Sequence, residues 1–231
     1  MLVATAVPAE RDAVVRAFPG AAEQVHVPGV SLLRTSGPCD LVATGVGPAA
    51  AAAATAAALS AAAHAGTPYG LVVCAGIGGG FQPEAPVGSL VVARTITVAD
   101  LGAETADGFL PVTDLGFGVV SHHPPRSLVR QVASATGAGV GTVLTVSTVT
   151  GTAARAAELR ARHPGARAEG MEGFGVAEAA GAQGRPVLEI RAISNPVGPR
   201  DRAAWRIADA LDALTEGFGK LAPVLEGWKP A

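Results

Sequence analysis

The chain has 231 residues, a length that suits one large α/β domain or two small ones. Its 17 basic side chains are matched by 19 acidic ones, so the positive excess that a nucleic-acid binder needs is missing. Hydrophobic residues make up 49% of the chain and charged residues 16%, a composition that excludes a disordered protein. The most apolar stretch, 49–63, is too short to span a bilayer. The amino terminus lacks a signal-peptide pattern, so we expect a cytoplasmic protein.

The first part of the chain alternates short β-branched runs with alanine-rich segments, which is typical of βα units around a largely parallel sheet. The apolar run ending at Ala75 is continuous, as expected of a strand buried on both faces, and it leads into the glycine-rich segment GIGGGF. The predicted elements are strand Leu2–Val7, helix Ala9–Phe18, a hairpin of Val30–Thr35 and Asp40–Val46 with the turn SGPC, helix Pro48–His64 and strand Tyr69–Ala75.

The second part continues this alternation around a segment at 100–126 that is rich in Gly, Pro and His, where we expect loop with at most one short strand. Gly173 and Gly175 fall in the first turns of a predicted helix, where each costs about 1 kcal/mol relative to alanine, so we expect close backbone packing there. The predicted elements are strand Gly88–Thr97, helix Ser127–Thr136, strand Thr142–Val146, helix Thr152–Arg162, the short segment Ala166–Glu169, helix Met171–Gln183, strand Val187–Ile193 and helix Asp201–Leu225. With no repeat and no linker, we expect residues 1–231 to form a single domain.

Motifs for several other chemistries are missing from the sequence. GIGGGFQPEAPVG leads into a proline-rich loop and then a strand, so it is not a dinucleotide-binding fingerprint; it is either a flexible connection or a loop whose N–H groups approach a ligand. His122 and His123 are adjacent and point in opposite directions, so they cannot share a metal ion. Cys39 and Cys74 are expected to be buried hydrophobic residues. We therefore expect no cofactor and no metal ion.

Three polar side chains stand at the ends of predicted strands or at a helix start. Glu10 follows the first strand, Glu172 begins a helix, and Asn195 follows the strand Val187–Ile193. Taken singly, each has a structural explanation, because carboxylates are favoured in the first turn of a helix and asparagine is common in turns. Together they fall at the carboxyl edge of a parallel sheet, where open α/β folds bind their ligands. That shared position makes them candidates for one site.

Six segments, in order, resemble motifs of the nucleoside phosphorylase and nucleosidase superfamily: AVPAERDAV, VATGVGPAAAAAA, VVCAGIGGGF, VGSLVVARTITVADLGAE, AEGMEGFGVAEAA and RAISN. The resemblance covers nearly the whole chain. It implies a three-layer αβα fold with a central mixed β-sheet, and a homodimer or higher homo-oligomer with a subunit interface beside the site. VSTVTGT and RAISNPVGPRDR resemble more narrowly the futalosine hydrolases, N-ribosyl hydrolases of menaquinone biosynthesis.

The resemblance implies roles for particular residues around a purine nucleoside. Glu10 matches the carboxylate that activates the attacking water, and Glu172 matches the carboxylate that holds the ribose 2′- and 3′-hydroxyls. Met171 matches the residue that packs beneath the sugar, while Gly76 and Ile77 match the loop beside base and sugar. Breaking an N-glycosidic bond places positive charge on the ribose, so carboxylates near the sugar suit this chemistry.

Two further positions refine the implied reaction. Arg191 matches an arginine that steadies the water site, and Asn195 stands at the purine, where the methylthioadenosine nucleosidases carry aspartate. An amide accepts from N7–H and donates to a 6-oxo group, which suits hypoxanthine, whereas an aspartate suits adenine. We therefore predict a 6-oxopurine nucleoside such as futalosine as the substrate, cleaved to hypoxanthine and dehypoxanthine futalosine.

Other functions stay open at this level. The phosphorylases of the superfamily carry an arginine before the glycine-rich segment, where this chain has the uncharged run 71–75, so water is favoured over phosphate as nucleophile. A methylthioadenosine-type nucleosidase and a non-catalytic nucleoside-binding module are the remaining alternatives. Arg200 or Arg202 is predicted to pair with the carboxylate of the substrate's carboxyphenyl group. No residue is assigned to stack on the base, since Phe81 and Phe174 read as core residues.

Overall fold

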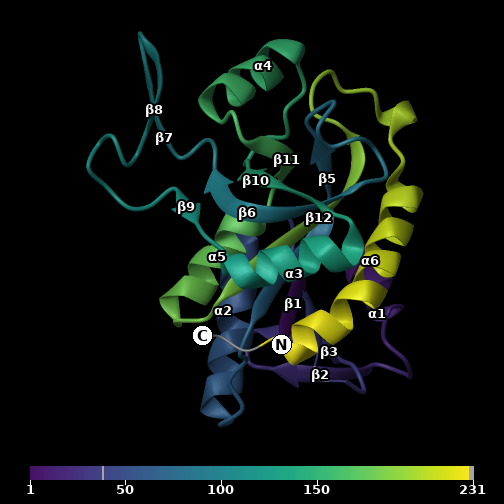
Figure 1. Ribbon diagram of the computed structural model, residues 1–231. Helices are drawn as coiled ribbons and strands as arrows, with labels where there is room; N and C mark the ends of the chain where they lie inside the picture. The colour runs from purple at the N-terminus through teal and green to yellow at the C-terminus, as the bar shows by residue number, and fades with distance from the viewer. Residues whose placement is uncertain (38, 229–231) are drawn as a thin grey trace.

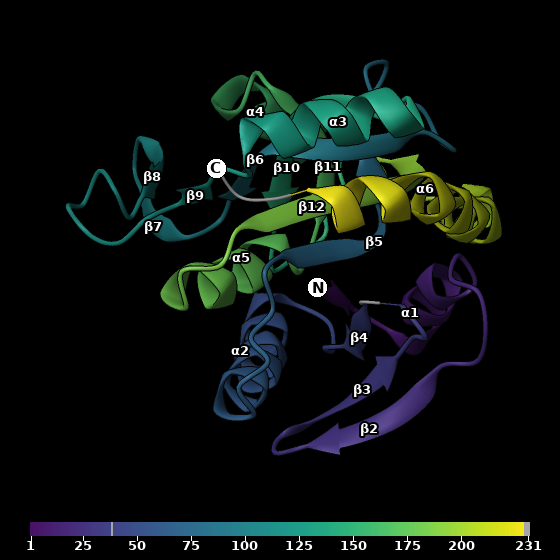
Figure 2. The ribbon, with the colours of Figure 1, turned by 60° about the horizontal axis from the view of Figure 1, so that its bottom comes forward.

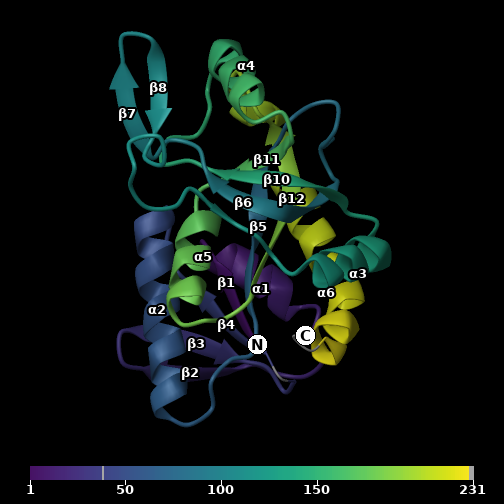
Figure 3. The ribbon, with the colours of Figure 1, turned by 60° about the vertical axis from the view of Figure 1, so that its left-hand side comes forward.

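The computed structural model describes residues 1–37 and 39–228, and within them ten strands form one mixed sheet. Beside it, a separate hairpin projects from the rest of the protein (Figures 1 and 3). The strands of the sheet are β1 (Leu2–Thr5), β2 (Glu23–Val27), β3 (Val30–Arg34), β4 (Asp40–Ala43), β5 (Val72–Gly80), β6 (Leu90–Val98), β9 (Ser121–His122), β10 (Gly139–Thr145), β11 (Ala166–Gly170) and β12 (Val187–Pro196), and those of the hairpin are β7 (Gly102–Thr105) and β8 (Gly108–Pro111).

Helices cover both faces of the sheet, which confirms the predicted α/β fold with a central mixed sheet. Apolar side chains of α2 and α5 pack on one face, where all views show the two helices side by side, and those of α1, α3 and α6 pack on the other (Figures 1 to 3). The helices are α1 (Pro8–Val15), α2 (Pro48–His64), α3 (Arg126–Thr136), α4 (Ala153–Arg162), α5 (Gly173–Ala182) and α6 (Ile207–Gly227), with a 3-10 turn η1 (Arg202–Ala204). No helix among the described residues is long and apolar enough to cross a membrane.

The glycine-rich segment is a strand, so its prediction as a loop is wrong. β5 continues through Gly80 and pairs with β12 along one edge, while its end pairs with β11 along the other. Since β12, β6, β10 and β11 are paired in turn, these five strands close into a ring. A Cβ on Gly78 would lie 2.6 Å from the Glu169 carbonyl oxygen, and one on Gly80 would lie 2.1 Å from that of Ala85. Gly78 therefore lets β5 and β11 come close enough to close the ring, and Gly80 makes room for the segment that follows β5.

Three strands run parallel at the centre of the sheet. β1 pairs with β5, and β5 pairs with β12, all in the same direction. Their carboxyl ends therefore reach one edge of the sheet, as predicted, and the segments that follow them meet there. We call this the carboxyl edge.

Other element predictions are partly right. The hairpin of β3 and β4 is present, although residue 38 of its predicted turn lies outside the described residues, and β2 beside it is not predicted. The segment 100–126 contains β7, β8 and β9 rather than one short strand at most, because each of these is too short to show a hydrophobic period. The last helix begins at Ile207, after η1, and not at Asp201. Cys39 and Cys74 are buried, as predicted.

Candidate active site

A cavity of about 480 Å³ opens at the carboxyl edge, and we call it the carboxyl-edge cavity. Side chains from widely separated segments line it together, including those of Glu10, Glu172 and Asn195. Met171 and Ile77 also line it, whereas Gly76 and Arg191 are not among the lining residues. The structure thus brings together the three polar residues that the sequence singles out.

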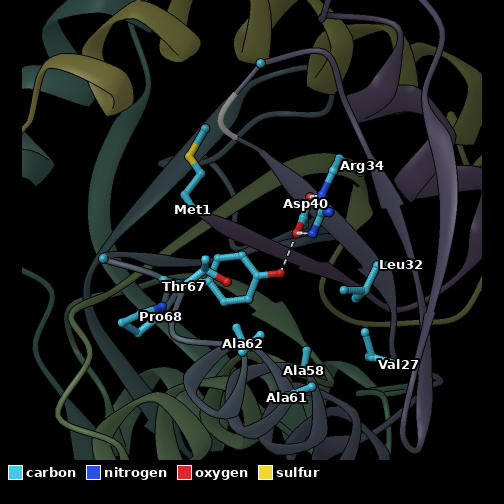
Figure 4. A pocket seen from close by; sticks show the side chains of 14 residues that line it. Met1, Val27, Leu32, Arg34, Asp40, Ala58, Ala61, Ala62, Thr67 and Pro68 are labelled. Carbon is cyan, nitrogen blue, oxygen red and sulfur yellow. Dashed lines mark hydrogen bonds and ion pairs between the residues drawn. The ribbon is translucent and has the colours of Figure 1, made fainter.

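A second cavity, of about 400 Å³, lies near the amino end of β1 (Figure 4). Asp40, which lines it, pairs in register with Leu2 and so marks the opposite edge of the sheet. The Arg34 guanidinium donates to both oxygens of Asp40 at 2.9 Å, and the Tyr69 hydroxyl donates to the same carboxylate at 2.6 Å. The Asp40 carboxylate is thus already paired with Arg34 and Tyr69. We therefore place the candidate active site in the carboxyl-edge cavity.

Glu10 is held by backbone N–H groups from the two residues before α1 and from one residue of β5. Helix α1 begins at Pro8, and the carboxylate turns back to accept from the N–H groups of Ala6 at 2.9 Å and Val7 at 3.3 Å. Its other oxygen accepts from the Ile77 N–H at 2.8 Å. The side chain is 4% exposed, and burial raises the pKa of this carboxyl above the ordinary glutamate value, against the lowering effect of the Arg191 charge and these hydrogen bonds.

Glu172 stands at the N-cap position of α5, and its carboxylate is bonded to two other parts of the chain. It accepts from the Gly47 N–H at 3.2 Å, just before α2, and from the Met171 N–H at 3.3 Å. The Arg191 guanidinium donates to it at 3.1 Å and also to Glu189 at 2.9 Å. Arg191 is 1% exposed, so it lies behind the cavity and holds two buried carboxylates in place.

Asn195 lies near the end of β12, with its amide fixed by its neighbours along the chain. The Ser194 hydroxyl donates to the amide oxygen at 2.8 Å, and the amide nitrogen donates to the Pro196 carbonyl at 2.9 Å. Each of these atoms can form one more hydrogen bond, because an amide oxygen has two lone pairs and an amide nitrogen two hydrogens. The side chain therefore offers an acceptor and a donor together.

Glu169 is a third carboxylate in the cavity, and the sequence analysis did not find it. It lies in β11, lines the cavity and is 4% exposed. Its two oxygens accept from the N–H group and the hydroxyl of Thr150, at 2.9 Å and 2.5 Å. Burial raises the pKa of this carboxyl, while the bonds from Thr150 act in the lowering direction. A glutamate two residues before Met171 was the available signal in the sequence.

An aromatic residue at the cavity was also missed. Trp205 lines the cavity together with Arg202, at the end of η1. The guanidinium carbons of Arg200 and Arg202 lie 5.6 and 5.9 Å from its ring centroid, within cation–π range. Phe81 and Phe174 are buried in the hydrophobic clusters of the fold and do not line the cavity.

Taken together, these groups suit chemistry on a small polar molecule with a flat ring. Two carboxylates, Glu10 and Glu172, face one cavity from different elements, and neither is paired with a cation that lines it. Asn195 and Glu169 offer hydrogen bonds from the two strands that flank β5. Among the described residues, no group of three or more His, Cys, Asp or Glu side chains is arranged to hold a metal ion.

Comparison with known sequences gives full-length similarities. The family profile described as "Phosphorylase superfamily" matches residues 6–226. A futalosine hydrolase of Streptomyces coelicolor is 74% identical over 230 residues, which cover 100% of this chain and 98% of that protein. A futalosine hydrolase of Acidothermus cellulolyticus is 45% identical over 225 residues, which cover 95% of this chain and 89% of that protein.

Solved structures share the fold. The futalosine hydrolase of Helicobacter pylori superposes with a TM-score of 0.81 at 15% identity, covering 96% of this chain and 97% of the other. A methylthioadenosine/S-adenosylhomocysteine nucleosidase of Colwellia psychrerythraea, solved with adenine, superposes with a TM-score of 0.76 at 22% identity, covering 96% and 91%. At such identities the likeness concerns the fold alone.

Proposed function

Because the chain belongs to the phosphorylase superfamily and, within it, to the futalosine hydrolases, we propose that it hydrolyses the N-glycosidic bond of futalosine in menaquinone biosynthesis. The products are hypoxanthine and dehypoxanthine futalosine. The observation that carries the proposal is the pair of buried carboxylates, Glu10 and Glu172, that line one cavity at the carboxyl edge.

The two carboxylates have different tasks in this reaction. As the bond between ribose and base lengthens, positive charge grows on the sugar, and water must attack the anomeric carbon. Glu10 takes a proton from that water, and its three backbone N–H bonds fix its direction. Glu172, oriented by Arg191, accepts from the ribose 2′- and 3′-hydroxyls, with Met171 beneath the sugar.

Asn195 contacts the purine and stabilises the departing base. The base leaves with the electron pair of the glycosidic bond and takes one proton from solvent at N7. The free acceptor position of Asn195 accepts from this N7–H, and its free N–H donates to a 6-oxo group. A 6-amino group would instead place two donors together, which leaves buried polar groups unpaired. A 6-oxopurine nucleoside is therefore the preferred substrate, and Ile77 lies beside its base and sugar, whereas Gly76 does not line the cavity.

The charges around the cavity favour water over phosphate as nucleophile. A phosphorylase surrounds the phosphate with cations near the sugar, whereas in the described structure Arg202 is the one cation among the lining residues. Arg191 lies nearer the carboxylates, but it is engaged by Glu172 and Glu189. The ionised Glu10 would repel phosphate at the position where the nucleophile must stand.

Trp205 and the arginines beside it suit the far end of futalosine, which is an aromatic carboxylate. The indole offers a face for the phenyl ring, and Arg202 or Arg200 lies close enough to that indole to pair with the carboxylate. We therefore expect the carboxyphenyl group beside Trp205 and the reacting bond beside Glu10.

The exposed segment after β6 supports a homo-oligomer. Leu101, Leu115, Phe117 and Val119 are all exposed there, and Phe117 is 69% exposed. Large apolar side chains gathered in one segment are typical of an interaction surface. We propose that this segment packs against another copy of the chain.

A direct assay tests the proposed reaction. The protein is incubated without phosphate with futalosine or with its 6-amino analogue, and released base is measured. We expect hypoxanthine from futalosine and little adenine from the analogue; strict dependence on phosphate would instead indicate a phosphorylase, and equal release of adenine would contradict the role of Asn195.

The same assay on Glu10→Gln separates an enzyme from a binding module. We expect its kcat to fall roughly 10²- to 10⁴-fold while substrate affinity is kept, because the base for water is lost. Glu23→Gln, on an exposed residue of β2, serves as the matched control with unchanged activity. Affinity for the nucleoside with no turnover by the unaltered protein would favour the binding module.

A further inference from the structure

We propose that Glu169 is a second specificity-determining residue, which accepts a hydrogen bond from N1–H of a 6-oxopurine while Asn195 contacts the imidazole side of the same ring. The inference rests on the proposed function for the position of the base beside Asn195. It adds a contact on the opposite edge of the base, and it makes the preference for a 6-oxopurine depend on two side chains rather than one.

Strand register places the two side chains on either side of one glycine. Glu169 pairs with Gly79 across the antiparallel contact of β11 and β5, and Asn195 pairs with the same Gly79 across the parallel contact of β5 and β12. Residues paired across neighbouring strands direct their side chains to the same face of the sheet. Both side chains accordingly line the carboxyl-edge cavity.

The separation of the two residues suits a flat base. Two strand spacings put their Cα positions roughly 9–10 Å apart, which leaves room for a ring with a hydrogen bond at each end. Gly79 itself lines the cavity and has no side chain to fill the gap. A Cβ there would lie 2.9 Å from Val197 Cγ2 and 3.5 Å from Asn195 Nδ2, so a larger residue would intrude on the place of the base.

Glu169 is oriented before the base arrives. Thr150 donates to both of its oxygens, which fixes the plane of the carboxylate and favours its charged form. A carboxylate has about four acceptor positions, so two remain after these bonds. The side chain is almost fully buried and lines the cavity, so these remaining positions are open to a donor on the base.

The chemistry of N1 explains why this contact selects the base. In hypoxanthine N1 carries a hydrogen and donates to the carboxylate. In adenine N1 carries a lone pair, which an ionised carboxylate repels. Glu169 therefore contacts N1, while Asn195 contacts N7 and the 6-substituent. Both contacts favour a 6-oxopurine over a 6-aminopurine.

Binding of free bases tests this contact without a variant. Isothermal titration calorimetry compares hypoxanthine with 1-deazahypoxanthine, in which C–H replaces N1–H at nearly the same size. We expect the deaza base to bind roughly 10- to 100-fold more weakly, the range for losing a hydrogen bond to a charged group. Equal affinities for the two bases would overturn the inference, whatever the protein does to futalosine.

A variant then tests the residue itself. In Glu169→Gln, which can still accept from Thr150, we expect the kcat/KM ratio of futalosine to its 6-amino analogue to fall at least 10-fold and the two free bases to bind alike. Glu216→Gln, on an exposed residue of α6, is the matched control that keeps both ratios. If Glu169 only tied Thr150 to the sheet, the variant would lower activity on both substrates and leave their ratio unchanged, which overturns the inference. Failure of the proposed function is distinct, because it shows as no hypoxanthine released from futalosine by the unaltered protein.

Discussion

At the scale of single residues, Glu10 shows how burial and hydrogen bonding oppose each other. Three backbone N–H groups stabilise its charge, yet burial has the larger effect and raises its pKa. A raised pKa brings the proton affinity of a general base closer to neutral pH, where proton transfer from water is more favourable. The pKa of Glu10 is therefore set by burial and several neighbouring groups together, and not by a single neighbour.

This environment predicts a pH dependence. Glu10 must be ionised to accept a proton, so activity should be lost as the pH falls through its raised pKa. We expect the acid limb of log kcat/KM for futalosine to have its midpoint above the ordinary glutamate pKa. Hypoxanthine release measured between pH 4 and 9 checks this, with circular dichroism showing that the protein stays folded; a midpoint at or below the ordinary value contradicts it.

Arg191 predicts a large effect on stability. Its guanidinium joins Glu172 and Glu189 in a buried group, so Arg191→Met leaves two buried carboxylates without their cation. We expect the free energy of unfolding in urea to fall by about 3–5 kcal/mol. Adding Glu189→Gln should recover part of this loss, since one buried charge is then removed.

Arg130→Met, on an exposed residue of α3, provides the control for that measurement and should change stability little. A loss of equal size in both variants would show that the buried ion pairs of Arg191 are not the cause.

The residues of the site differ in how far the sequence could predict them. Glu10, Glu172 and Asn195 follow from their positions after strands or at a helix start, because parallel strands deliver such positions to one edge. Glu169 could not be found in this way, since its place beside Gly79 depends on the register between β11 and β5. Trp205 reaches the cavity only because η1 interrupts the predicted helix.

At the scale of elements, glycines set how closely backbones approach. In α5, a Cβ on Gly175 would lie 2.0 Å from the Pro48 carbonyl oxygen at the start of α2. The sequence predicts close packing at this helix from the cost of glycine there, but not its partner. β5 is different: a run of glycines is typical of loops, and its pairing with β12 on one side and β11 on the other explains why it is a strand.

Two glycine-to-alanine changes, one in α5 where it packs on α2 and one in an exposed part of α6, should have opposite effects on stability. Gly175→Ala should lower the free energy of unfolding by about 1–3 kcal/mol through overpacking. Gly219→Ala, in an exposed turn of α6 with no atom near its Cβ, should raise it by about 0.5–1 kcal/mol through helix propensity. Urea denaturation of both variants checks the sign, and stabilisation by Gly175→Ala would contradict the close contact.

At the scale of the whole molecule, the exposed apolar segment after β6 predicts self-association. Light scattering with size-exclusion chromatography should give a mass at least twice the 22.8 kDa of one chain. Phe117→Asp should shift this mass toward that of a monomer, because a charge replaces an exposed aromatic at the proposed interface. Arg16→Asp, a charge change on an exposed surface of the molecule, is the control; a monomeric parent protein would contradict the proposal.

The ring formed by β5, β12, β6, β10 and β11 also has a consequence for the time during synthesis at which the protein can first bind a base. β5 is made early, but both neighbours of Gly79, on β11 and β12, follow much later in the chain. Contacts between such distant segments form slowly and close last. A chain still growing on the ribosome therefore has Glu10 long before it has the strands on either side of Gly79, and we expect the proposed nucleoside binding only after the ring has closed.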